Sequence, residues 1–270
     1  MRRTITGFSN PTVKLLRSLR DKKHRRAERM FLAEGLRLLT DALESGRVPK
    51  ILVMADMRDP HPLLATLEAA VDGAGGEVIE TSPDILSKIT GKDNPQGVVG
   101  VFDEFDTSLP GLDRSAAPIW LVAQALRDPG NLGTMLRTGD AIGAGGLILI
   151  DDCADPFSVE AVRASMGAVF TQKIARAPWS EFLLWLRGGA GQLVAASLRD
   201  AVPYRDAPYS APCFVLVGNE SRGLPEEYEA ACDLRVTMPM KGRADSLNAA
   251  VAAAVLGYEV LSALEGSPAR

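Results

Sequence analysis

The sequence predicts an α/β protein with two domains, and two features of the 270-residue chain carry that prediction. Apolar segments of strand length alternate with amphipathic segments of helix length along most of the chain. Residues 103–117, which are acidic, contain Pro and Gly and show no hydrophobic period, interrupt this alternation. We therefore expect a small α/β domain over 1–102, a linker over 103–117 and a larger α/β domain over 118–270.

The first domain begins with a basic segment of helical character. Residues 10–29 start with Asn-Pro, and Val13, Leu16 and Leu19 form a thin apolar seam, which predicts a helix. Leucines at helical spacing predict a second helix over 31–46, ended by its glycine. Beyond it the pattern predicts strands over 51–55, 77–80 and 97–102, and helices over 62–71 and 82–90.

The second domain shows a longer alternation with more apolar strands. Short, continuously apolar strands are typical of a parallel sheet whose two faces are both covered. We expect strands over 119–124, 146–150, 173–177, 192–197, 213–218 and 234–238. We expect one helix to begin near residue 131, three more over 158–170, 179–186 and 225–232, and a long helix at the end of the sequence.

Composition indicates a cytoplasmic globular protein. The sequence contains no run of eighteen apolar residues, so we expect no membrane span, and the N-terminus lacks the apolar region of a secretory signal. Cys153, Cys213 and Cys232 are far apart and form no CxxC pair, which favours reduced thiols in the cytosol. Cys213, beside an apolar run, is expected to be a buried strand residue.

Charge is distributed unevenly along the chain. Residues 1–30 contain ten Lys or Arg against Asp21 and Glu28, although the whole chain carries a net charge of −4. Clustered cations on an acidic protein favour a polyanionic partner, because they neutralise phosphates and release counterions. A solvated helix face with no partner would have the same composition.

The residue types and motifs present in the sequence exclude several kinds of catalytic site. The dinucleotide fingerprint would need a third glycine at position 148, where Ile148 stands, and no phosphate-binding P-loop pattern occurs. His24 and His61, the only histidines, both lie in the first domain. A Ser-His-Asp triad or a histidine-based metal site is therefore excluded from the second domain, and no metal is expected. Chemistry there depends on Arg, Asn, Ser, Glu and backbone groups.

Three segments of the second domain carry polar residues that are candidates for catalysis or ligand binding. In 128–143, Asn131 precedes an apolar helical stripe as a plausible N-cap, and Arg137 lies off that stripe. An ordinary cap and a solvated arginine would explain both. In the second segment, a buried strand ends at Gly218 and is followed by polar residues 219–222, where open α/β sheets bind ligands.

The third segment leads into the last helix. Its strand stops at Pro239, and Ser246 or Asp245 is a candidate cap. The helix is small or apolar on every side from Ala249 to Leu256, so both faces are expected to be buried, either by the core or by a second subunit.

Together these segments resemble the three motifs of the SpoU (TrmH) family of RNA ribose 2′-O-methyltransferases, in the SPOUT superfamily. The pattern N-x-G-x-x-x-R, the loop G-x-E-x-x-G and the segment P-M-x-G-x-x-x-S-L-N all occur, in the family's order and spacing. The matching residues are Asn131, Gly133 and Arg137; Gly218, Glu220 and Gly223; and Pro239, Met240, Gly242, Ser246, Leu247 and Asn248. The first domain is similar to the family's L30e-like substrate-binding module, so the resemblance covers nearly the whole chain.

The resemblance implies a fold, a cofactor and an assembly. The second domain would be a SPOUT α/β domain with a deep trefoil knot, a rare exception to unknotted chains. It would bind S-adenosylmethionine (SAM) at Gly218, Met238 and Leu247. The active site would lie at a homodimer interface built partly from the last helix.

The resemblance also implies residue roles. Arg137 would lie at the ribose 2′-hydroxyl and its adjacent phosphate, as a general base or as an electrostatic anchor; a guanidinium rarely loses a proton. Asn131, Glu220, Ser246 and Asn248 would orient Arg137 and the ribose. Many relatives have a second glycine where this chain has Ser221-Arg222, and Arg222 could add a phosphate contact.

Three functions remain open at this point. The first is SAM-dependent ribose methylation of 23S-type ribosomal RNA, favoured because tRNA-specific relatives usually lack the L30e-like domain. Transfer RNA is the alternative substrate. A non-catalytic RNA-binding factor for ribosome assembly is a different class, and the intact Arg137 and Asn248 count against it. A nucleotide-dependent α/β enzyme has no fingerprint in the sequence.

Overall fold

The computed structural model describes residues 1–56 and 61–266, and its chain forms two compact units. Unit 1 comprises Met1–Phe105 and Asp155–Thr171, and unit 2 comprises Asp106–Ala154 and Gln172–Arg270. Contacts therefore group seventeen residues from the middle of the chain with its N-terminal part. The sequence boundaries at 102 and 118 stay a prediction.

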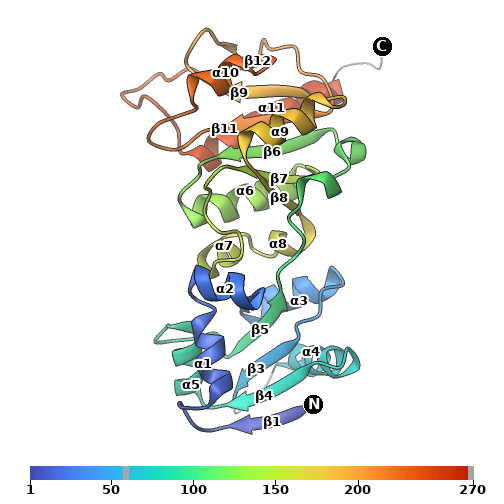
Figure 1. Ribbon diagram of the computed structural model, residues 1–270, viewed down its shortest axis with the longest axis vertical. Helices are drawn as coiled ribbons and strands as arrows, with labels where there is room; N and C mark the ends of the chain where they lie inside the picture. Colours follow the sequence, from blue (N-terminus) through green and yellow to red (C-terminus); the bar gives the residue numbers. More distant parts are fainter. Residues whose placement is uncertain (57–60, 267–270) are drawn as a thin grey trace. The chain divides into compact units, whose positions relative to one another are not determined.

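Unit 1 is a mixed sheet flanked by helices (Figure 1). Its strand order is β1-β4-β3-β5-β2, in which β1, β4 and β3 are parallel and β5 is antiparallel to both of its neighbours. The strands are β1 (Arg2–Ile5), β2 (Met30–Glu34), β3 (Ile51–Ala55), β4 (Glu77–Thr81) and β5 (Val98–Asp103). The helices are α1 (Pro11–Ser18), α2 (Lys22–Glu28), α3 (Leu36–Glu44), α4 (Pro62–Gly73), α5 (Pro83–Thr90), α7 (Val159–Ala164) and α8 (Ala168–Thr171).

Two helices predicted for unit 1 are longer in the prediction than in the structure. The helix over 10–29 is divided into α1 and α2, because Asp21 caps a new helix by accepting a hydrogen bond from the Lys23 N–H. The helix over 31–46 starts only at Leu36, since the preceding residues pair with β5 as strand β2. Gly35, at φ 112°, supplies the backbone conformation that separates strand from helix. Burial of Val13, Leu16 and Leu19 confirms the predicted seam.

Residues 155–171 belong to the core of unit 1 through aromatic contacts. The ring of Phe157 lies 5.0 Å from that of Phe31, and the ring of Phe170 lies 4.8 Å from that of Phe102. Positive φ angles at Met166 and Gly167 divide the expected helix over 158–170 into α7 and α8.

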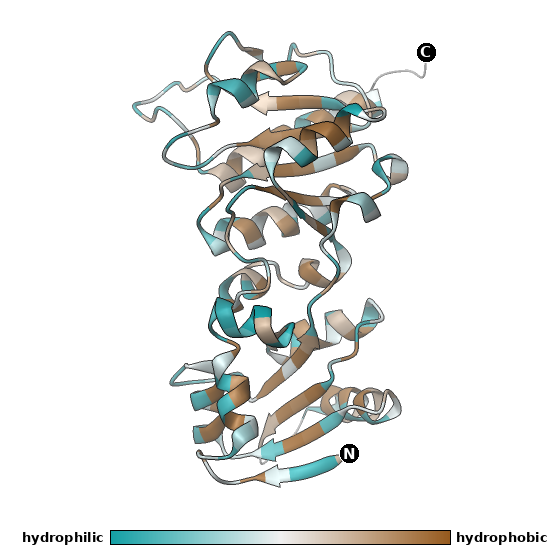
Figure 2. Ribbon diagram, in the orientation of Figure 1, coloured by the Kyte–Doolittle hydropathy of each residue, from teal (hydrophilic) through white to brown (hydrophobic). Residues whose placement is uncertain are grey.

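Unit 2 contains a seven-stranded sheet in which every pairing is parallel. Its order is β10-β12-β9-β11-β6-β7-β8. The strands are β6 (Ile119–Gln124), β7 (Gly146–Ile150), β8 (Lys173–Ala177), β9 (Gln192–Ala196), β10 (Val202–Pro203), β11 (Cys213–Val217) and β12 (Leu234–Thr237). Every residue of β6, β7 and β11 is buried, as expected for a sheet with two covered faces, and these strands are mostly brown in Figure 2. The α/β prediction is confirmed.

Among its described residues, unit 2 also contains four helices and two short 3-10 turns. They are α6 (Pro129–Ala141), α9 (Trp179–Arg187), α10 (Glu226–Ala230), α11 (Ala249–Gly266), η1 (Leu109–Gly111) and η2 (Arg114–Ala116). Helix α11 packs against β6, β11 and α6. By length and composition alone α11 could cross a membrane, a test that a core helix of a soluble protein also passes.

The last helix is buried on one face only within the single chain. Ala253, Leu256 and Val260 are buried against unit 2, but Val251 and Tyr258 are 46% and 53% exposed. Within the single chain, therefore, the core covers only one face of α11, and burial of the other face by a second subunit stays a prediction.

Candidate functional site

The three motif segments meet at one edge of the sheet in unit 2. Strands β12, β9, β11 and β6 are adjacent and parallel, so their carboxyl ends lie along the same edge. The loops that follow β6 and β11 and the segment that follows β12 carry the three motifs. An edge of this kind is where open α/β sheets bind their ligands.

A chain of hydrogen bonds joins one residue from each motif. The Nδ2 atom of Asn248 donates to Oδ1 of Asn131 over 2.9 Å, and Nδ2 of Asn131 donates to Oε1 of Glu220 over 3.0 Å. These residues are 117 and 89 positions apart in the sequence. Three of the five predicted catalytic residues are therefore in direct contact.

Helix capping sets the direction of these hydrogen bonds. The Oδ1 atom of Asn248 accepts from the backbone N–H groups of Ala250 and Val251, at 2.9 and 3.3 Å, in the first turn of α11. Its amide nitrogen must then face Asn131, which in turn must present its own amide nitrogen to Glu220. Glu220 thus receives a donor whose orientation is fixed by a helix terminus.

The caps of α6 and α11 are not the residues expected from the sequence. Asp128 caps α6 by accepting from the backbone N–H groups of Gly130 and Asn131, so Asn131 lies inside the first turn. The side chain of Asn131 is thereby available for Glu220. Asn248, rather than Ser246 or Asp245, provides the capping hydrogen bonds of α11, and Ser246 Oγ donates to Asp245.

The loop after β11 is a tight turn that presents Glu220. A Cβ atom on Gly218 would lie 2.6 Å from the backbone carbon of Gly223, so only glycine fits. Gly223 has a φ of 67°, a left-handed conformation, and its N–H donates to the Asn219 carbonyl over 2.9 Å. The G-x-E-x-x-G spacing therefore has a steric reason at both glycines.

A cavity of about 340 Å³ lies beside this loop. All three predicted cofactor residues, Gly218, Met238 and Leu247, line it, together with Glu220 and Ser246. Other walls are apolar, including Leu198, Val217 and Ala252. A small molecule with an apolar or aromatic part and a few polar groups fits a lining of this kind.

Arg137 is not part of the network. It lies on α6 six residues beyond Asn131, which places it about 9 Å further along the helix axis and on a different side. Its side chain is exposed and makes no hydrogen bond or ion pair with the residues that the structure describes. Within one chain, Arg137 therefore forms no hydrogen bond or ion pair with Asn131, Glu220 or Asn248, three of the four residues expected to orient it.

Two polar residues near the site make contacts that the sequence did not predict. Asn219 Nδ2 donates to the Ala125 carbonyl over 2.9 Å, which ties the loop after β11 to the loop after β6. Asp151 accepts from Gln124 Nε2 and from the Tyr228 hydroxyl. Burial, followed by the hydrogen bond to Asp151, raises the pKa of Tyr228 to about 12. An Asx turn before a glycine was the available signal for Asn219; nothing local predicts the contacts of Asp151.

The described residues contain no group of three or more His, Cys, Asp or Glu side chains placed to hold a metal ion. Burial raises the pKa of the Cys153 thiol to about 11 and that of Cys213 to about 12. These thiols are protonated at neutral pH, so neither is an activated nucleophile.

Comparison with known proteins identifies both parts of the chain. Residues 118–258 match the SpoU rRNA Methylase family, and residues 10–100 match the MRM3-like substrate binding domain. The chain is 32% identical to the 23S rRNA (guanosine(2553)-2′-O)-methyltransferase RlmP of Bacillus subtilis, over 95% of this chain and 98% of that protein. It is 31% identical to the 23S rRNA (uridine(2479)-2′-O)-methyltransferase of Streptomyces viridochromogenes, over 90% and 85%.

Solved structures agree in fold. The AdoMet-bound rRNA methyltransferase from Sinorhizobium meliloti superposes with a TM-score of 0.90 at 42% identity, covering 96% of this chain and 97% of that one. AdoMet is another name for SAM. The chain belongs to the SpoU rRNA methylase family and has the SPOUT fold.

Proposed function

We propose that this protein transfers the methyl group of SAM to a ribose 2′-hydroxyl of large-subunit ribosomal RNA. The single observation that carries the proposal is the Asn248–Asn131–Glu220 hydrogen-bond chain, formed by all three motifs next to a cavity. The relatives named as 23S rRNA 2′-O-methyltransferases support the substrate class, since they match both units of the chain.

The cavity fits SAM by its size and its lining. Met238 and Leu247 provide apolar walls for an adenine ring, while the tight turn at Gly218 brings backbone N–H and C=O groups to the cavity wall. When bound there, SAM supplies a methyl group made electrophilic by the positively charged sulfur. We assign cofactor binding to Gly218, Met238 and Leu247.

The hydrogen-bond chain is suited to positioning. Asn131 and Glu220 hold each other in one orientation, and the α11 cap prevents the Asn248 amide from rotating. Preorganised side chains of this kind contribute to rate by fixing the direction of attack rather than by chemistry of their own. We assign them, with Ser246 at the cavity wall, to orienting the ribose.

Arg137 is assigned to the phosphate next to the target ribose. Its guanidinium is exposed and is free to bind an anion. The separation of Arg137 from Glu220 within one chain favours an electrostatic anchor over a general base.

We further propose that the protein is a cytoplasmic homodimer formed through α11. The exposed Val251 and Tyr258 lie on the face of this helix that unit 2 leaves uncovered. A second copy seated there would also approach α6, which packs against α11 and carries Arg137. The trefoil knot is proposed with the fold of the family.

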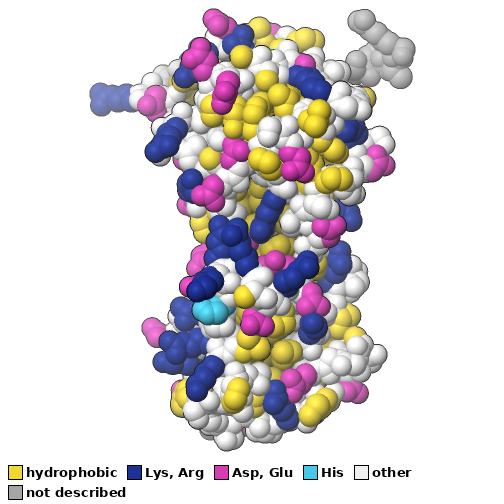
Figure 3. All heavy atoms as spheres, in the orientation of Figure 1, with side chains coloured by type: hydrophobic (Ala, Val, Ile, Leu, Met, Phe, Trp, Pro, Cys, Tyr) yellow, Lys and Arg dark blue, Asp and Glu magenta, His cyan; other side chains and the backbone are white. Residues whose placement is uncertain are grey.

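Unit 1 offers a surface for the RNA backbone. Six exposed cations occupy α1, α2 and the residues that follow them, and Figure 3 shows dark-blue side chains gathered over these helices. They are Lys14, Arg17, Arg20, Lys23, Arg26 and Arg29. Phosphate contacts from such residues position RNA without reading its sequence. The match to an MRM3-like substrate binding domain supports this role.

The deciding experiment is transfer of labelled methyl from SAM to protein-free ribosomal RNA, assembled large subunits and tRNA. Label in ribosomal RNA, resistant to alkali at one linkage and lost in Arg137→Ala, is the expected result. Label in tRNA alone would keep the chemistry and overturn the substrate. No transfer together with no SAM binding by calorimetry would favour an assembly factor. Lys173→Gln, an exposed cation on β8, serves as the control variant.

A further inference from the structure

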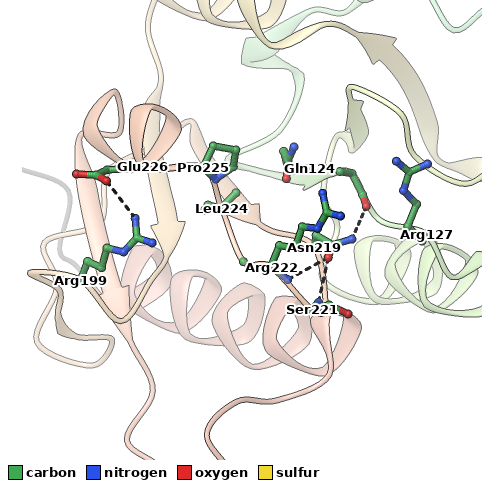
Figure 4. Close-up of a pocket in the computed structure, with 11 residues that line it drawn as sticks. Gln124, Arg127, Arg199, Asn219, Ser221, Arg222, Leu224, Pro225 and Glu226 are labelled. Carbon is green, nitrogen blue, oxygen red and sulfur yellow. Dashed lines mark hydrogen bonds and ion pairs between the residues drawn. The ribbon is translucent and has the colours of Figure 1, made fainter.

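A second pocket lies on the other side of the loop that presents Glu220. Its volume is about 670 Å³, and the loops after β6, β9 and β11 form its walls (Figure 4). Residues Asn219 and Ser221–Leu224 line both this pocket and the cofactor cavity. The two hollows therefore share one wall, and we call the second one the arginine pocket.

Three arginines, one from each of the loops, line the arginine pocket: Arg127, Arg199 and Arg222. Glu226 is the one carboxylate among the lining residues that the structure describes. An excess of positive charge at the carboxyl edge of a sheet attracts anions. None of the three was assigned a role in cofactor binding or in orienting the ribose.

The loop holds Arg222 in a defined place. Asn219 Oδ1 accepts from the backbone N–H groups of Ser221 and Arg222, at 3.0 and 3.1 Å, while its Nδ2 is tied to Ala125. In Figure 4 the side chain of Arg222 lies beside Gln124 and Asn219. The guanidinium of Arg222 has no carboxylate partner within residues 1–56 and 61–266.

The other two arginines have partners that an anion could replace or share. Arg127 pairs with Asp152, and both side chains are more than half exposed. Arg199 lies 3.2 Å from Glu229 and 4.0 Å from Glu226. The exposed Arg127–Asp152 pair contributes at most about 1 kcal/mol, so it does not prevent the Arg127 guanidinium from turning to a stronger ligand. Glu229 is only 7% exposed, so Arg199 is held more firmly. Arginine matches the oxygens of a phosphate with two parallel N–H groups.

We propose that the arginine pocket binds a phosphodiester of the substrate RNA close to the target ribose, with Arg222 as its main ligand and Arg127 in support. The inference rests on the proposed function, because a ribose held at Asn131 and Glu220 has flanking phosphates one loop away. Because the arginine pocket and the cofactor cavity share a wall, the RNA strand whose ribose lies at the cavity can also reach the pocket. This assigns to the arginine pocket the part of RNA binding that lies nearest to catalysis.

The test measures RNA binding and methyl transfer separately, in the full-length protein. Arg222→Gln and Arg127→Gln remove a charge each, Arg222→Lys keeps the charge without the bidentate geometry, and Lys173→Gln removes a charge far along the sheet, on β8. Kd for a ribosomal RNA fragment is measured against salt, KM and kcat by methyl transfer, and the Kd of SAM by calorimetry.

For Arg222→Gln we expect RNA binding to weaken about tenfold and the slope of log K against log salt to fall by about 0.7 to 0.9. KM for RNA should rise by a larger factor than kcat falls, Arg222→Lys should restore part of the affinity, and SAM affinity should stay at the wild-type value. Arg127→Gln should shift the same quantities less.

Three results would overturn the proposal. RNA affinities and salt slopes of Arg222→Gln and Arg127→Gln equal to those of Lys173→Gln would remove the pocket from RNA binding, while wild-type methylation kept the proposed function intact. Weaker SAM binding with unchanged RNA binding would make the pocket part of the cofactor site. A wild-type protein that neither binds nor methylates RNA would refute the pocket and the proposed function together.

Discussion

The hydrogen-bonded site of unit 2 and the basic face of unit 1 are built on opposite principles. By the basic face we mean the exposed cations Lys14, Arg17, Arg20, Lys23, Arg26 and Arg29. The site joins short side chains from positions 131, 220 and 248 through hydrogen bonds of 2.9 and 3.0 Å. The basic face uses long cations from one stretch of about sixteen residues, exposed to water and free to move. We expect the site to depend on the geometry of its hydrogen bonds and the basic face to depend on its total charge. Substitutions should therefore affect the two regions differently.

Among the cations of residues 1–30, Arg25 is expected to contribute to stability rather than to RNA binding. The guanidinium of Arg25 is 3% exposed and lies 2.8 Å from Asp155, and it also donates to the carbonyls of Leu19 and Arg20. We expect Arg25→Met to lower the free energy of unfolding by about 3–5 kcal/mol, because the buried carboxylate of Asp155 would lose the guanidinium that neutralises its charge. Urea unfolding measures this loss.

The matched control is an exposed pair. Arg187 and Asp233 are 41% and 37% exposed, so Arg187→Met should cost at most about 1 kcal/mol. Equal losses in the two variants would show that Arg25 belongs with the other surface cations of the basic face and has no special structural role.

Breaking the hydrogen-bond chain should have the next largest effect. Asn131→Ala removes the donor to Glu220 and the acceptor of Asn248, and we expect kcat to fall about 100-fold with the fold intact. Thr134→Ala, exposed one turn further along α6, is the control. Since the chain acts as one unit, Asn131→Ala and Asn248→Ala should together cost less than the sum of their separate effects on the activation free energy. Additive losses would contradict a connected network.

Each charge removed from the basic face should weaken RNA binding by a small step. Replacing Lys14, Arg17 and Arg26 by Gln should reduce the salt slope of RNA binding by about 2 to 3 and be compensated by higher RNA concentration. Lys50→Gln, whose ammonium pairs with Asp103, should change the slope little. A triple variant with the wild-type salt dependence would exclude α1 and α2 from phosphate binding.

The smallest effect on function is expected from the thiols of unit 2. Burial is the main cause that raises the pKa values of Cys153 and Cys232 to about 11 and about 12, from an ordinary value of 9.0. At pH 8 the native thiolate fraction should be lower than in the unfolded chain by about 100-fold at Cys153 and about 1000-fold at Cys232, so iodoacetamide should label the native protein slowly without loss of activity.

The same shift has a defined sign for stability. The folded state holds these thiol protons more tightly than the unfolded state, so the contribution to stability is complete below pH 9 and is lost as the pH rises toward 11 and 12. Native labelling at pH 8 as fast as that of the denatured protein would contradict the burial of both thiols.

The sequence by itself determined the α/β class, nearly all the strands of unit 2 and the residue types available for chemistry. These features depend on local signals: continuous apolar runs such as β6 and β11, and the buried stripe of α6 through Leu132, Met135 and Leu136. Motif spacing also placed Asn131, Glu220 and Asn248 in one functional group, although it could not state which atoms meet.

Only the tertiary structure decided the caps, the partners and the pockets. Asp128 rather than Asn131 caps α6, Arg25 is buried while its neighbours are exposed, and Arg127 and Arg222 line one hollow. Each outcome depends on which distant segments the strand order makes adjacent: β11 lies between β9 and β6, which precede it by about 20 and 90 residues. Local periodicity contains no information about such pairings, because the contacts arise only when the parallel strands share an edge.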